Sequence, residues 1–399
     1  MTADWTGRTL ELDVGPVAHG GHCVSRVDGR VVFVRHTLPG ERVLAEVTED
    51  RGKSFCRADA IRVLRPSADR VEPPCPVARP GLCGGCDWQH ADGAAQRRLK
   101  ASVVGEQLRR LAGLDWPVEV EELPGSLLRW RTRVRFVTGP DGRPGLRAHR
   151  SHRVVPLEDC PITLQDAAKT GLSRRARPGT EIEVTEDATG RVHTAELRPA
   201  AHGRAGRPKQ LTGGIAVERA AGRTWRLAAH GFWQVHPAAA DTFASVVGEW
   251  AAASPGARVW DLYAGVGLFA SVLAEQVGPT GSVLAVESGR RAVRDGEANL
   301  ADLPQVRWRC GRVEHVLSGV DEQAEVVVLD PPRKGAGRDV VASVVDAVPE
   351  RVVYVACDPA ALARDVATFA EHGYRLARLR AFDAFPMTHH VECVALLTR

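Results

Sequence analysis

Four residues that could take part in chemistry stand at the ends of apolar runs in the last third of the chain. Three are the carboxylates Asp261, Glu287 and Asp330, and the fourth is the thiol Cys357. Short valine-rich runs that alternate with helix-length segments indicate a parallel sheet, and such sheets bind ligands at the carboxyl ends of their strands. We therefore expect the four side chains to converge on one crevice. A nucleotide-like cofactor bound there would lie beside a reactive thiol.

The first of these strand ends leads into a glycine-rich turn, Gly265 to Ala270, that fits a dinucleotide fingerprint. Glu287 lies twenty residues after Gly267, where a carboxylate contacts a ribose hydroxyl in that fold. A tight strand-to-helix turn without any ligand would use the same glycines. Asp261 before the turn and a second acidic strand end, Asp330 to Arg333, favour S-adenosylmethionine over NAD.

Cys357 precedes Asp358 and Pro359, so it lies on a strand-to-helix turn and not inside a strand. The common alternative is a buried, inert cysteine, but its place beside the expected cofactor crevice favours a nucleophile. Glu392 begins the last apolar run. If that run is a strand antiparallel to its neighbours, Glu392 faces Cys357, and otherwise it is a solvated side chain.

Three cysteines lie close together in an irregular segment rich in Pro and Gly, with Cys75, Cys83 and Cys86 in the spacing Cys-x7-Cys-x2-Cys. Zinc usually takes four ligands in paired spacings, whereas three close cysteines with one distant partner suit an iron–sulfur cluster. Cys160 is the other cysteine in the middle of the chain. The alternative of three free thiols does not explain a Cys-Gly-Gly-Cys loop.

The elements that position these residues fall into three expected domains within 399 residues. Residues 6–63 contain about five short strands, with a hairpin signal at Asp28-Gly29, and predict an OB-like barrel over 1–64. We expect a central α+β domain over 65–225 and a Rossmann-like α/β domain over 226–399.

The middle of the chain is its basic part. Residues 65–225 hold 27 Lys and Arg against 19 Asp and Glu, a net charge of +8, within a chain of net charge +4. Strand alternation places Arg129, Arg131, Arg133 and Arg135 on one face. That face is either a solvated surface or a phosphate-contacting one, in which Arg131 and Arg133 bind a polyanion such as RNA.

Composition argues against a membrane protein or a secreted one. No apolar stretch approaches membrane-spanning length, and the first residues lack a signal-peptide pattern. Cysteines clustered in a reducing compartment favour metal binding or catalysis over disulfides. We expect a cytoplasmic monomer that does not contact membranes.

Taken together, these segments resemble the S-adenosylmethionine-dependent RNA (uracil-5-)-methyltransferases, in particular the iron–sulfur members with an N-terminal TRAM domain. The resemblance covers nearly the whole chain. The motifs that carry it are Cys83-Gly84-Gly85-Cys86, Phe232-Trp233-Gln234-Val235, Asp261-Leu262-Tyr263-Ala264-Gly265-Val266-Gly267, Asp330-Pro331-Pro332-Arg333, Cys357-Asp358-Pro359 and Phe385-Pro386-Met387-Thr388-His389-His390-Val391-Glu392.

The resemblance implies a class I methyltransferase fold and a role for each motif. Cys357 is implied to be the nucleophile, Glu392 the general base and Phe232 the stacking partner of the target base. The residues implied to line the cofactor and base pocket are Gln234, Tyr263, Gly265, Glu287 and Asp330. The residues implied to hold a [4Fe-4S] cluster are Cys75, Cys83, Cys86 and Cys160.

The chemistry needs this residue set. Carbon 5 of uracil is a poor nucleophile until a thiolate adds to carbon 6 and converts the ring to an enolate. After carbon 5 has taken the methyl group, a base must remove its proton so that the thiolate can leave. The implied substrate is a uridine in RNA, with 23S ribosomal RNA favoured over tRNA.

The chain departs from the family pattern at several positions. The gap between Cys75 and Cys83 is longer than usual. His236 and Asp358 each stand where an Asn is usual. Leu268 and Arg312 stand where some members contact the cofactor through amide side chains, so those contacts are not carried over to this chain.

Three other functions compete with uracil-5 methylation. A cytosine-5 RNA methyltransferase would carry a cysteine where this chain has Arg333. A non-catalytic RNA-binding assembly factor would not need both Cys357 and Glu392. A redox protein built around the cluster leaves the cofactor crevice unexplained.

Overall fold

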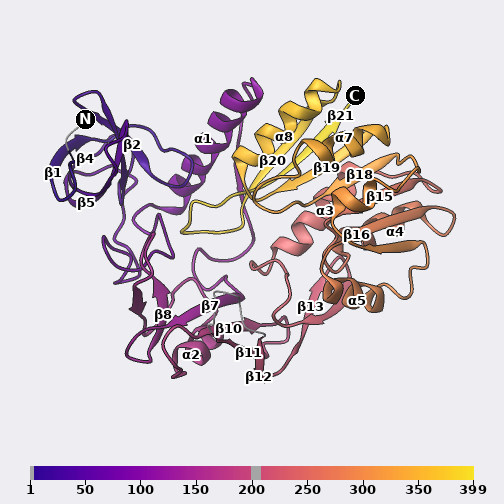
Figure 1. Ribbon diagram of the computed structural model, residues 1–399, viewed down its shortest axis with the longest axis horizontal. Helices are drawn as coiled ribbons and strands as arrows, with labels where there is room; N and C mark the ends of the chain where they lie inside the picture. Colours follow the sequence, from indigo (N-terminus) through magenta and orange to yellow (C-terminus); the bar gives the residue numbers. More distant parts are fainter. Residues whose placement is uncertain (1–3, 199–207) are drawn as a thin grey trace.

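The computed structural model describes residues 4–198 and 208–399. It contains an N-terminal barrel, a central antiparallel sheet and a C-terminal sheet of eight strands with helices on its faces (Figure 1). The mixed α/β architecture with a Rossmann-like C-terminal part confirms the predicted fold class.

Five short strands form the barrel, in the order β1-β4-β5-β3-β2. They are β1 (Thr9–Asp13), β2 (Cys23–Val27), β3 (Arg30–Arg35), β4 (Arg42–Asp50) and β5 (Phe55–Arg65). The turn between β2 and β3 has positive φ angles at Asp28 (49°) and Gly29 (78°), the backbone that a two-residue hairpin requires. After β1, the Gly15 nitrogen donates to the Val24 oxygen at 2.9 Å, which joins the two edge strands.

The central sheet has six antiparallel strands in the order β12-β11-β10-β7-β8-β9. They are β7 (Arg133–Thr138), β8 (Pro144–Arg147), β9 (Val154–Pro156), β10 (Glu181–Glu186), β11 (Val192–Leu197) and β12 (Lys209–Thr212). Helix α2 (Gln165–Leu172) packs so closely on it that a Cβ at Gly171 would lie 2.6 Å from the Phe136 ring. A hairpin of β13 (Ile215–Ala220) and β14 (Arg223–Ala228) follows.

The C-terminal sheet has the order β17-β16-β15-β18-β19-β21-β20-β6. Its strands are β6 (Val120–Glu122), β15 (Arg258–Leu262), β16 (Ser282–Glu287), β17 (Val306–Cys310), β18 (Val326–Leu329), β19 (Arg351–Ala356), β20 (Arg375–Asp383) and β21 (Glu392–Thr398). β15 to β19 run parallel, and β21 runs antiparallel to β19. The carboxyl ends of the parallel strands therefore share an edge with the start of β21.

Helices cover both faces of this sheet. They are α3 (Ala239–Ala251), α4 (Leu268–Val277), α5 (Arg290–Asn299), α6 (Val313–Leu317), α7 (Arg338–Asp346) and α8 (Pro359–Glu371). One face buries Phe243 of α3 and Leu273 of α4, and the other buries Val341 of α7 and Phe369 of α8. The strands are apolar on both sides because both sides are covered.

An earlier segment of the chain completes the C-terminal sheet. Strand β6 (Val120–Glu122) pairs in parallel with β20, and helix α1 (Gly93–Ala112) packs beside α8 (Figure 1). The buried ammonium of Lys100 in α1 donates to Asp383 of β20 at 2.5 Å. This segment lies within the expected central domain, 65–225, yet it packs with the expected third domain, 226–399. The three-domain division remains a proposal.

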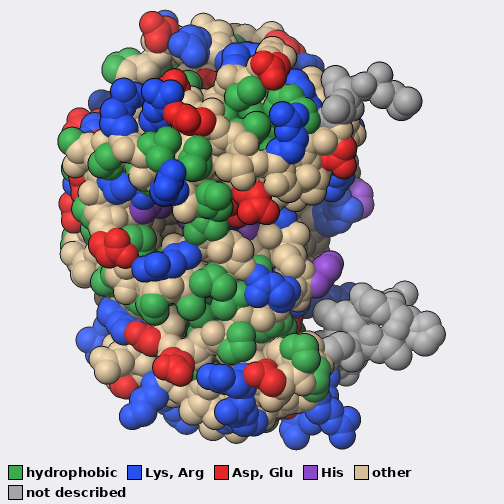
Figure 2. Space-filling model, turned by 90° about the vertical axis from the view of Figure 1, so that its left-hand side faces the viewer, with side chains coloured by type: hydrophobic (Ala, Val, Ile, Leu, Met, Phe, Trp, Pro, Cys, Tyr) green, Lys and Arg blue, Asp and Glu red, His purple; other side chains and the backbone are tan. Residues whose placement is uncertain are grey.

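Basic side chains are distributed over the face that the barrel and the central sheet share. Figure 2 shows Lys and Arg there, interspersed with acidic and hydrophobic side chains. Within residues 4–198 and 208–399, no helix combines the length and apolar character that crossing a bilayer requires.

Candidate active site

A cavity of about 1320 Å³ opens at the carboxyl edge of the parallel strands. Its walls come from the segment before α3, from the ends of β15 to β19 and from the segment that leads into β21. The predicted pocket residues that line it are Phe232, Gln234, Tyr263, Gly265, Glu287, Asp330, Cys357 and Glu392. The structure therefore brings together, around one space, side chains from six separate parts of the sequence.

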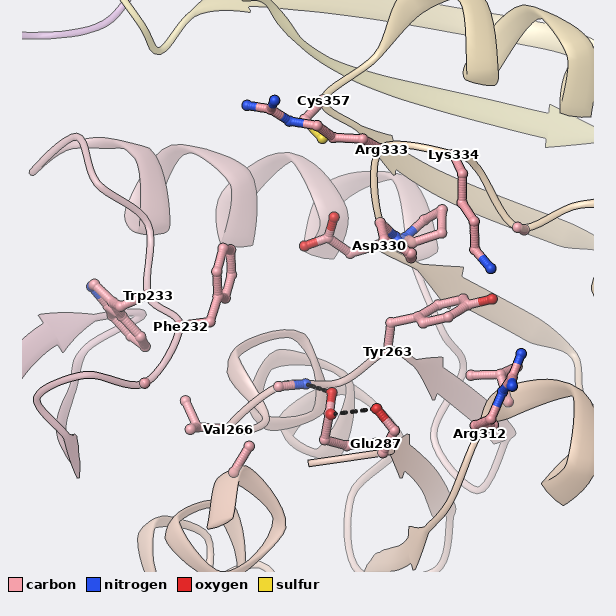
Figure 3. Close-up of a pocket in the computed structure, with 18 of the residues that line it drawn as sticks. Phe232, Trp233, Tyr263, Val266, Glu287, Arg312, Asp330, Arg333, Lys334 and Cys357 are labelled. Carbon is pink, nitrogen blue, oxygen red and sulfur yellow. Dashed lines mark hydrogen bonds between the residues drawn. The ribbon is translucent and has the colours of Figure 1, made fainter. Parts of the chain in front are cut away.

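The glycine-rich turn after β15 forms one side of the cavity (Figure 3). Tyr263, Gly265 and Gly267 all have positive φ angles, of 63°, 56° and 90°. Glu287 at the end of β16 accepts hydrogen bonds from the nitrogens of Gly265 at 3.1 Å and Gly289 at 2.6 Å. These bonds fix its carboxylate and leave lone pairs for the two hydroxyls of a ribose. The Glu287 carboxylate, with its remaining acceptor sites beside the glycine turn, thus fits a nucleoside-containing cofactor.

Asp261 does not reach this cavity, contrary to the expectation that four strand-end residues converge. Its side chain is fully buried, and one oxygen accepts from the Ala270 nitrogen in the first turn of α4 at 2.8 Å. Burial raises its pKa to about 8, so the carboxyl holds a proton at neutral pH. Asp261 therefore links β15 to the first turn of α4 and does not face the cavity.

Cys357 and Glu392 lie on the opposite side of the cavity from the glycine turn. β19 and β21 are antiparallel with Ala356 paired to Cys393, so the next residues along the two strands are Cys357 and Glu392. The antiparallel pairing required for them to face each other is present. Burial and the negative charges of Glu392 and Asp330 raise the pKa of the Cys357 thiol to about 12.

The carboxyls in this half of the cavity are buried as well. Glu392 is 3% exposed, and burial together with the charge of Asp330 raises its pKa well above the ordinary carboxyl value. Burial raises the pKa of Asp330 to about 7. The Cys357 thiol therefore retains its proton at neutral pH, Asp330 titrates near neutral pH, and the surroundings of Glu392 favour its protonated form.

Arg333 supplies the positive charge that opposes these effects, and its role was not predicted from the sequence. Its charge lowers the pKa of both Cys357 and Glu392, and Figure 3 shows it beside Cys357. The His390 Nε2 lies 3.4 Å from an Arg333 nitrogen. Burial lowers the pKa of His390 to about 3, so the neutral ring can accept that bond. The signal in the sequence was the arginine that ends Asp-Pro-Pro-Arg.

A buried pair on neighbouring elements holds the loop that carries Arg333. The Tyr354 hydroxyl of β19 donates to Asp365 of α8 at 2.5 Å, and the same carboxylate accepts from the Ala336 nitrogen at 2.7 Å. A Cβ at Gly335 would lie 2.6 Å from this carboxylate, and the φ of Gly335 is +88°. The loop after β18 is therefore anchored by Asp365, and only glycine fits at its closest approach.

Phe232 presents its ring to the cavity, whereas its neighbour Trp233 points into the core (Figure 3). Phe232 is 71% exposed, and Trp233 is buried against Trp225 with ring centroids 5.8 Å apart. A large exposed aromatic ring beside a cavity is placed to stack on a planar ligand.

Two of the departures from the family pattern have structural roles here. His236 is buried and stacks on Trp130 with ring centroids 6.0 Å apart, and its Nδ1 accepts from the Ala238 nitrogen. Asp358 caps α8 by accepting from the Ala361 nitrogen at 2.8 Å. Neither departure removes a group that lines the cavity.

The arginines in and just before β7 already have partners within the chain. Arg133 donates to Glu218 at 2.7 Å, with both side chains largely buried, and Arg131 donates to the Arg133 oxygen at 2.9 Å. Arg135 is exposed but forms ion pairs with Glu181 and Glu183. Burial alternates from Arg133 to Arg135 as predicted, so these two arginines share a face, but carboxylates of β10 and β13 pair with both. Phosphate contact by Arg131 and Arg133 stays an untested prediction.

The four predicted cluster cysteines are neighbours in space. Burial raises the pKa of Cys75, Cys83 and Cys86, and the charge of Cys160 adds to the effect in each case. Among the described residues, no three His, Cys, Asp or Glu side chains are close enough to hold a single metal ion. Four neighbouring thiols are the ligand type that an iron–sulfur cluster takes.

Two donors already point at these sulfurs. The Gln89 side chain donates to the Cys86 sulfur at 3.1 Å, and the Gly85 nitrogen donates to the Cys83 sulfur at 3.4 Å. Arg131 lies near enough for Cys160, Cys86 and Cys83 to affect its pKa. Hydrogen bonds to sulfur and a nearby cation stabilise thiolates, as a cluster requires.

Two family models match the chain. A TRAM domain model matches residues 5–60, and a tRNA (Uracil-5-)-methyltransferase model matches residues 312–399. The first covers the barrel strands, and the second covers the strands that carry Asp330, Cys357 and Glu392.

Full-length relatives match over almost the whole chain. A protein of Streptomyces coelicolor described as an uncharacterized RNA methyltransferase is 50% identical, over 98% of this chain and 93% of its own length. A protein of Streptomyces avermitilis with the same description is 49% identical over 98% of both chains. The tRNA (uracil-54, C5)-methyltransferase of Pyrococcus abyssi, solved with S-adenosyl-L-homocysteine, has a TM-score of 0.75, 20% identity and coverage of 98% and 100%. That last match shows a shared fold.

Proposed function

Because the chain belongs to the RNA methyltransferases with a TRAM domain and a tRNA (uracil-5-)-methyltransferase domain, which depend on S-adenosylmethionine, we propose that it methylates carbon 5 of a uridine through a covalent adduct with Cys357. The observation that carries the proposal is the pairing of β19 with β21, which places Cys357 beside Glu392 at the cavity edge. Glu287 and the glycine turn face the same space.

Each residue has one step in the proposed reaction. The Cys357 sulfur bonds to carbon 6 of the uracil, and the ring electrons move to the carbonyl oxygen at carbon 4. Glu287, Gln234 and Tyr263 would hold S-adenosylmethionine, which would supply the methyl group that carbon 5 takes and would leave as S-adenosyl-L-homocysteine. Once carbon 5 is methylated, ionised Glu392 removes its proton, the carbon–sulfur bond breaks and the thiolate leaves.

Two of these steps require that a side chain first lose its proton. The thiol must lose its proton before it attacks, and Arg333 favours the thiolate because its charge lowers the pKa of Cys357. Its guanidinium can also compensate for the negative charge that develops on the uracil ring. Glu392 must ionise before it acts as a base, and the same arginine favours that ionisation.

Phe232 is proposed to hold the target base. A uracil within folded RNA must leave its stack to reach Cys357, and an exposed phenylalanine on the opposite wall offers a replacement stacking surface. We propose a uridine of 23S ribosomal RNA as the target, since the chain combines a TRAM barrel with a four-cysteine segment. A tRNA uridine is the second candidate, supported by the name of the family model that matches residues 312–399.

Cys75, Cys83, Cys86 and Cys160 are proposed to hold a [4Fe-4S] cluster. Their mutual proximity and their N–H donors support this assignment. Cys86 directly precedes Asp87, which binds His389 near the start of β21. The cluster would therefore brace the segment that leads to Glu392, within a monomeric enzyme.

A methylation assay on defined RNAs tests the activity and the target together. Purified protein is incubated with labelled S-adenosylmethionine and transcripts of 23S ribosomal RNA or of tRNA, and the product nucleosides are separated. We expect 5-methyluridine in 23S ribosomal RNA. 5-Methyluridine in tRNA alone would select the second candidate, 5-methylcytidine would contradict the assigned base, and no product in either RNA would favour a non-catalytic assembly factor.

A further inference from the structure

A loop of the N-terminal barrel, residues 18–22, is docked against the catalytic part of the chain. The loop is a tight turn in which the Ala18 nitrogen donates to the His22 oxygen at 2.7 Å. The indole nitrogen of Trp88 donates to the Gly21 oxygen at 3.1 Å. Gly21 has a φ of +81°, and a Cβ there would lie 2.8 Å from the Cβ of His389. The loop therefore lies against the segment that leads to Glu392.

His389 is itself held by the cysteine segment. The Asp87 carboxylate lies 2.7 Å from His389 Nδ1 and accepts from the His389 backbone nitrogen at 3.1 Å. The nitrogens of Asp87 and Trp88 both donate to the Met387 oxygen, at 2.9 and 3.0 Å. The barrel loop, the cysteine segment and the segment before β21 thus contact one another at a single interface.

At this interface, His19 contacts Asp358, the residue next to the nucleophile. The His19 Nε2 lies 3.0 Å from one carboxylate oxygen of Asp358. The other oxygen accepts from the Ala361 nitrogen at the start of α8, at 2.8 Å. Asp358 directly follows Cys357, so one carboxylate links the turn that carries the thiol both to its helix and to the barrel.

We propose that the barrel is a positioning element of the active site, in which His19 fixes the Cys357 turn and compensates the charge of Asp358 beside the thiol. This inference rests on the proposed function of Cys357 as a nucleophile. It gives the TRAM barrel a part in the chemistry besides RNA contact.

The charges around His19 determine the sign of the effect. The groups that face it are Asp358, Arg364 of α8 and Glu106 of α1, and the hydrogen bond with Asp358 is the largest cause of its raised pKa. The negative charge of Asp358 contributes to the raised pKa of Cys357. Protonated His19 therefore favours the Cys357 thiolate at pH values below the His19 pKa, and this help is lost as pH rises through that pKa.

Alkylation of Cys357 by a neutral haloacetamide tests the inference in the full-length protein without RNA, with the modified peptide quantified by mass spectrometry. His19→Ala should slow alkylation at pH 6.5 by about twofold to fivefold, the range expected for one partly exposed ion pair. The difference should shrink at pH 9. His19→Gln keeps a donor without the charge, so it should restore the turn but stay slower than the parent at pH 6.5. His152→Ala, at an exposed histidine, is the matched control.

Asp358→Asn separates the charge from the cap, because Asn also caps helices well. This variant should alkylate at least as fast as the parent, and adding His19→Ala to it should cause no further slowing at pH 6.5. Equal rates for His19→Ala and the parent, or the same slowing in the Asp358→Asn background, would overturn the inference.

Methylation kinetics distinguish this inference from the proposed function. His19→Ala should lower kcat with little change in KM for RNA. An unchanged kcat with a raised KM would make His19 an RNA contact and overturn the positioning role. Methylation of RNA by the Cys357→Ala variant would refute the role of Cys357 as the nucleophile, whatever the alkylation rates of the His19 variants.

Discussion

Cys357 and Glu392 are adjacent across two antiparallel strands, one residue beyond the pair Ala356 and Cys393. Glu392 is buried and Cys357 is partly buried, and the Glu392 charge raises the pKa of the thiol. The free protein therefore holds its nucleophile as a thiol, and the surroundings of Glu392 favour the protonated form of the base. Reactivity then depends on the positive charge of Arg333 and on pH.

The first prediction concerns the pH dependence of the thiol. Burial, Glu392 and Asp330 raise the pKa of Cys357 to about 12, so the thiolate fraction below that pH grows about tenfold per pH unit. Alkylation of Cys357 by a neutral haloacetamide should increase steadily from pH 7 to pH 9 without a plateau. A plateau near the ordinary cysteine pKa would show that the surroundings do not suppress the thiolate.

The second prediction concerns Arg333. Arg333→Met removes the positive charge that lowers the pKa of both Cys357 and Glu392. One nearby opposite charge shifts a pKa by about 1–3 units, so alkylation of Cys357 at pH 8 should slow by at least about tenfold. Arg375→Met, at an exposed position at the start of β20, is the control. Equal alkylation rates in Arg333→Met and the parent would show that the Arg333 charge does not favour the thiolate.

The third prediction concerns stability and Asp261. Burial raises its pKa to about 8 from an ordinary value of 3.8, so between these values the folded state holds a proton that the unfolded state has lost. Its contribution to the free energy of unfolding is fully present below the lower value and falls by about 1.4 kcal/mol per pH unit as pH rises toward 8.

Asp261→Asn cannot titrate, so its stability relative to the parent should improve steadily from pH 5 to pH 8. Urea unfolding of the two proteins at several pH values measures the difference and cancels the contributions of Asp330 and Glu392. A difference that does not change with pH would mean that Asp261 is ionised in the folded protein.

The fourth prediction concerns the cysteines. Protein purified without oxygen should be brown and contain about four irons per chain, as a [4Fe-4S] site requires. Cys160→Ser should lose the colour, whereas Cys310→Ser, at an exposed cysteine outside the group, should keep it. Stoichiometric zinc with no iron in the parent protein would contradict the cluster.

The sequence predicted the parts of the site that depend on strand order. Alternating apolar runs placed Glu287, Asp330 and Cys357 at one edge, and an antiparallel last strand brought Glu392 to them. Asp261 was misplaced because a strand-end carboxylate can cap the following helix or face a ligand, and the residue types do not distinguish the two. The hydrogen bond that the Asp261 side chain accepts from the Ala270 nitrogen shows that it caps the helix.

Contacts between distant segments could not be predicted from local patterns. The pairing of Arg133 with Glu218 and the contact of His19 with Asp358 depend on how separate sheets dock. The addition of β6 to the edge of the C-terminal sheet beside β20 is likewise a tertiary event. Charge counts along the chain show an excess, but they do not show which arginines already have carboxylate partners.

Denaturing gel electrophoresis of Cys357→Ala and Glu392→Gln with RNA and radiolabelled S-adenosylmethionine tests the central claim most directly. Glu392→Gln should attack and methylate the uridine but fail to remove the carbon 5 proton, so a methyl-labelled protein–RNA adduct should accumulate. Turnover should fall by roughly 10²–10⁴-fold, the usual loss when a general base is removed. Cys357→Ala should give neither adduct nor methylated RNA. Methylation by Cys357→Ala, or normal turnover without adduct in Glu392→Gln, would contradict the covalent mechanism.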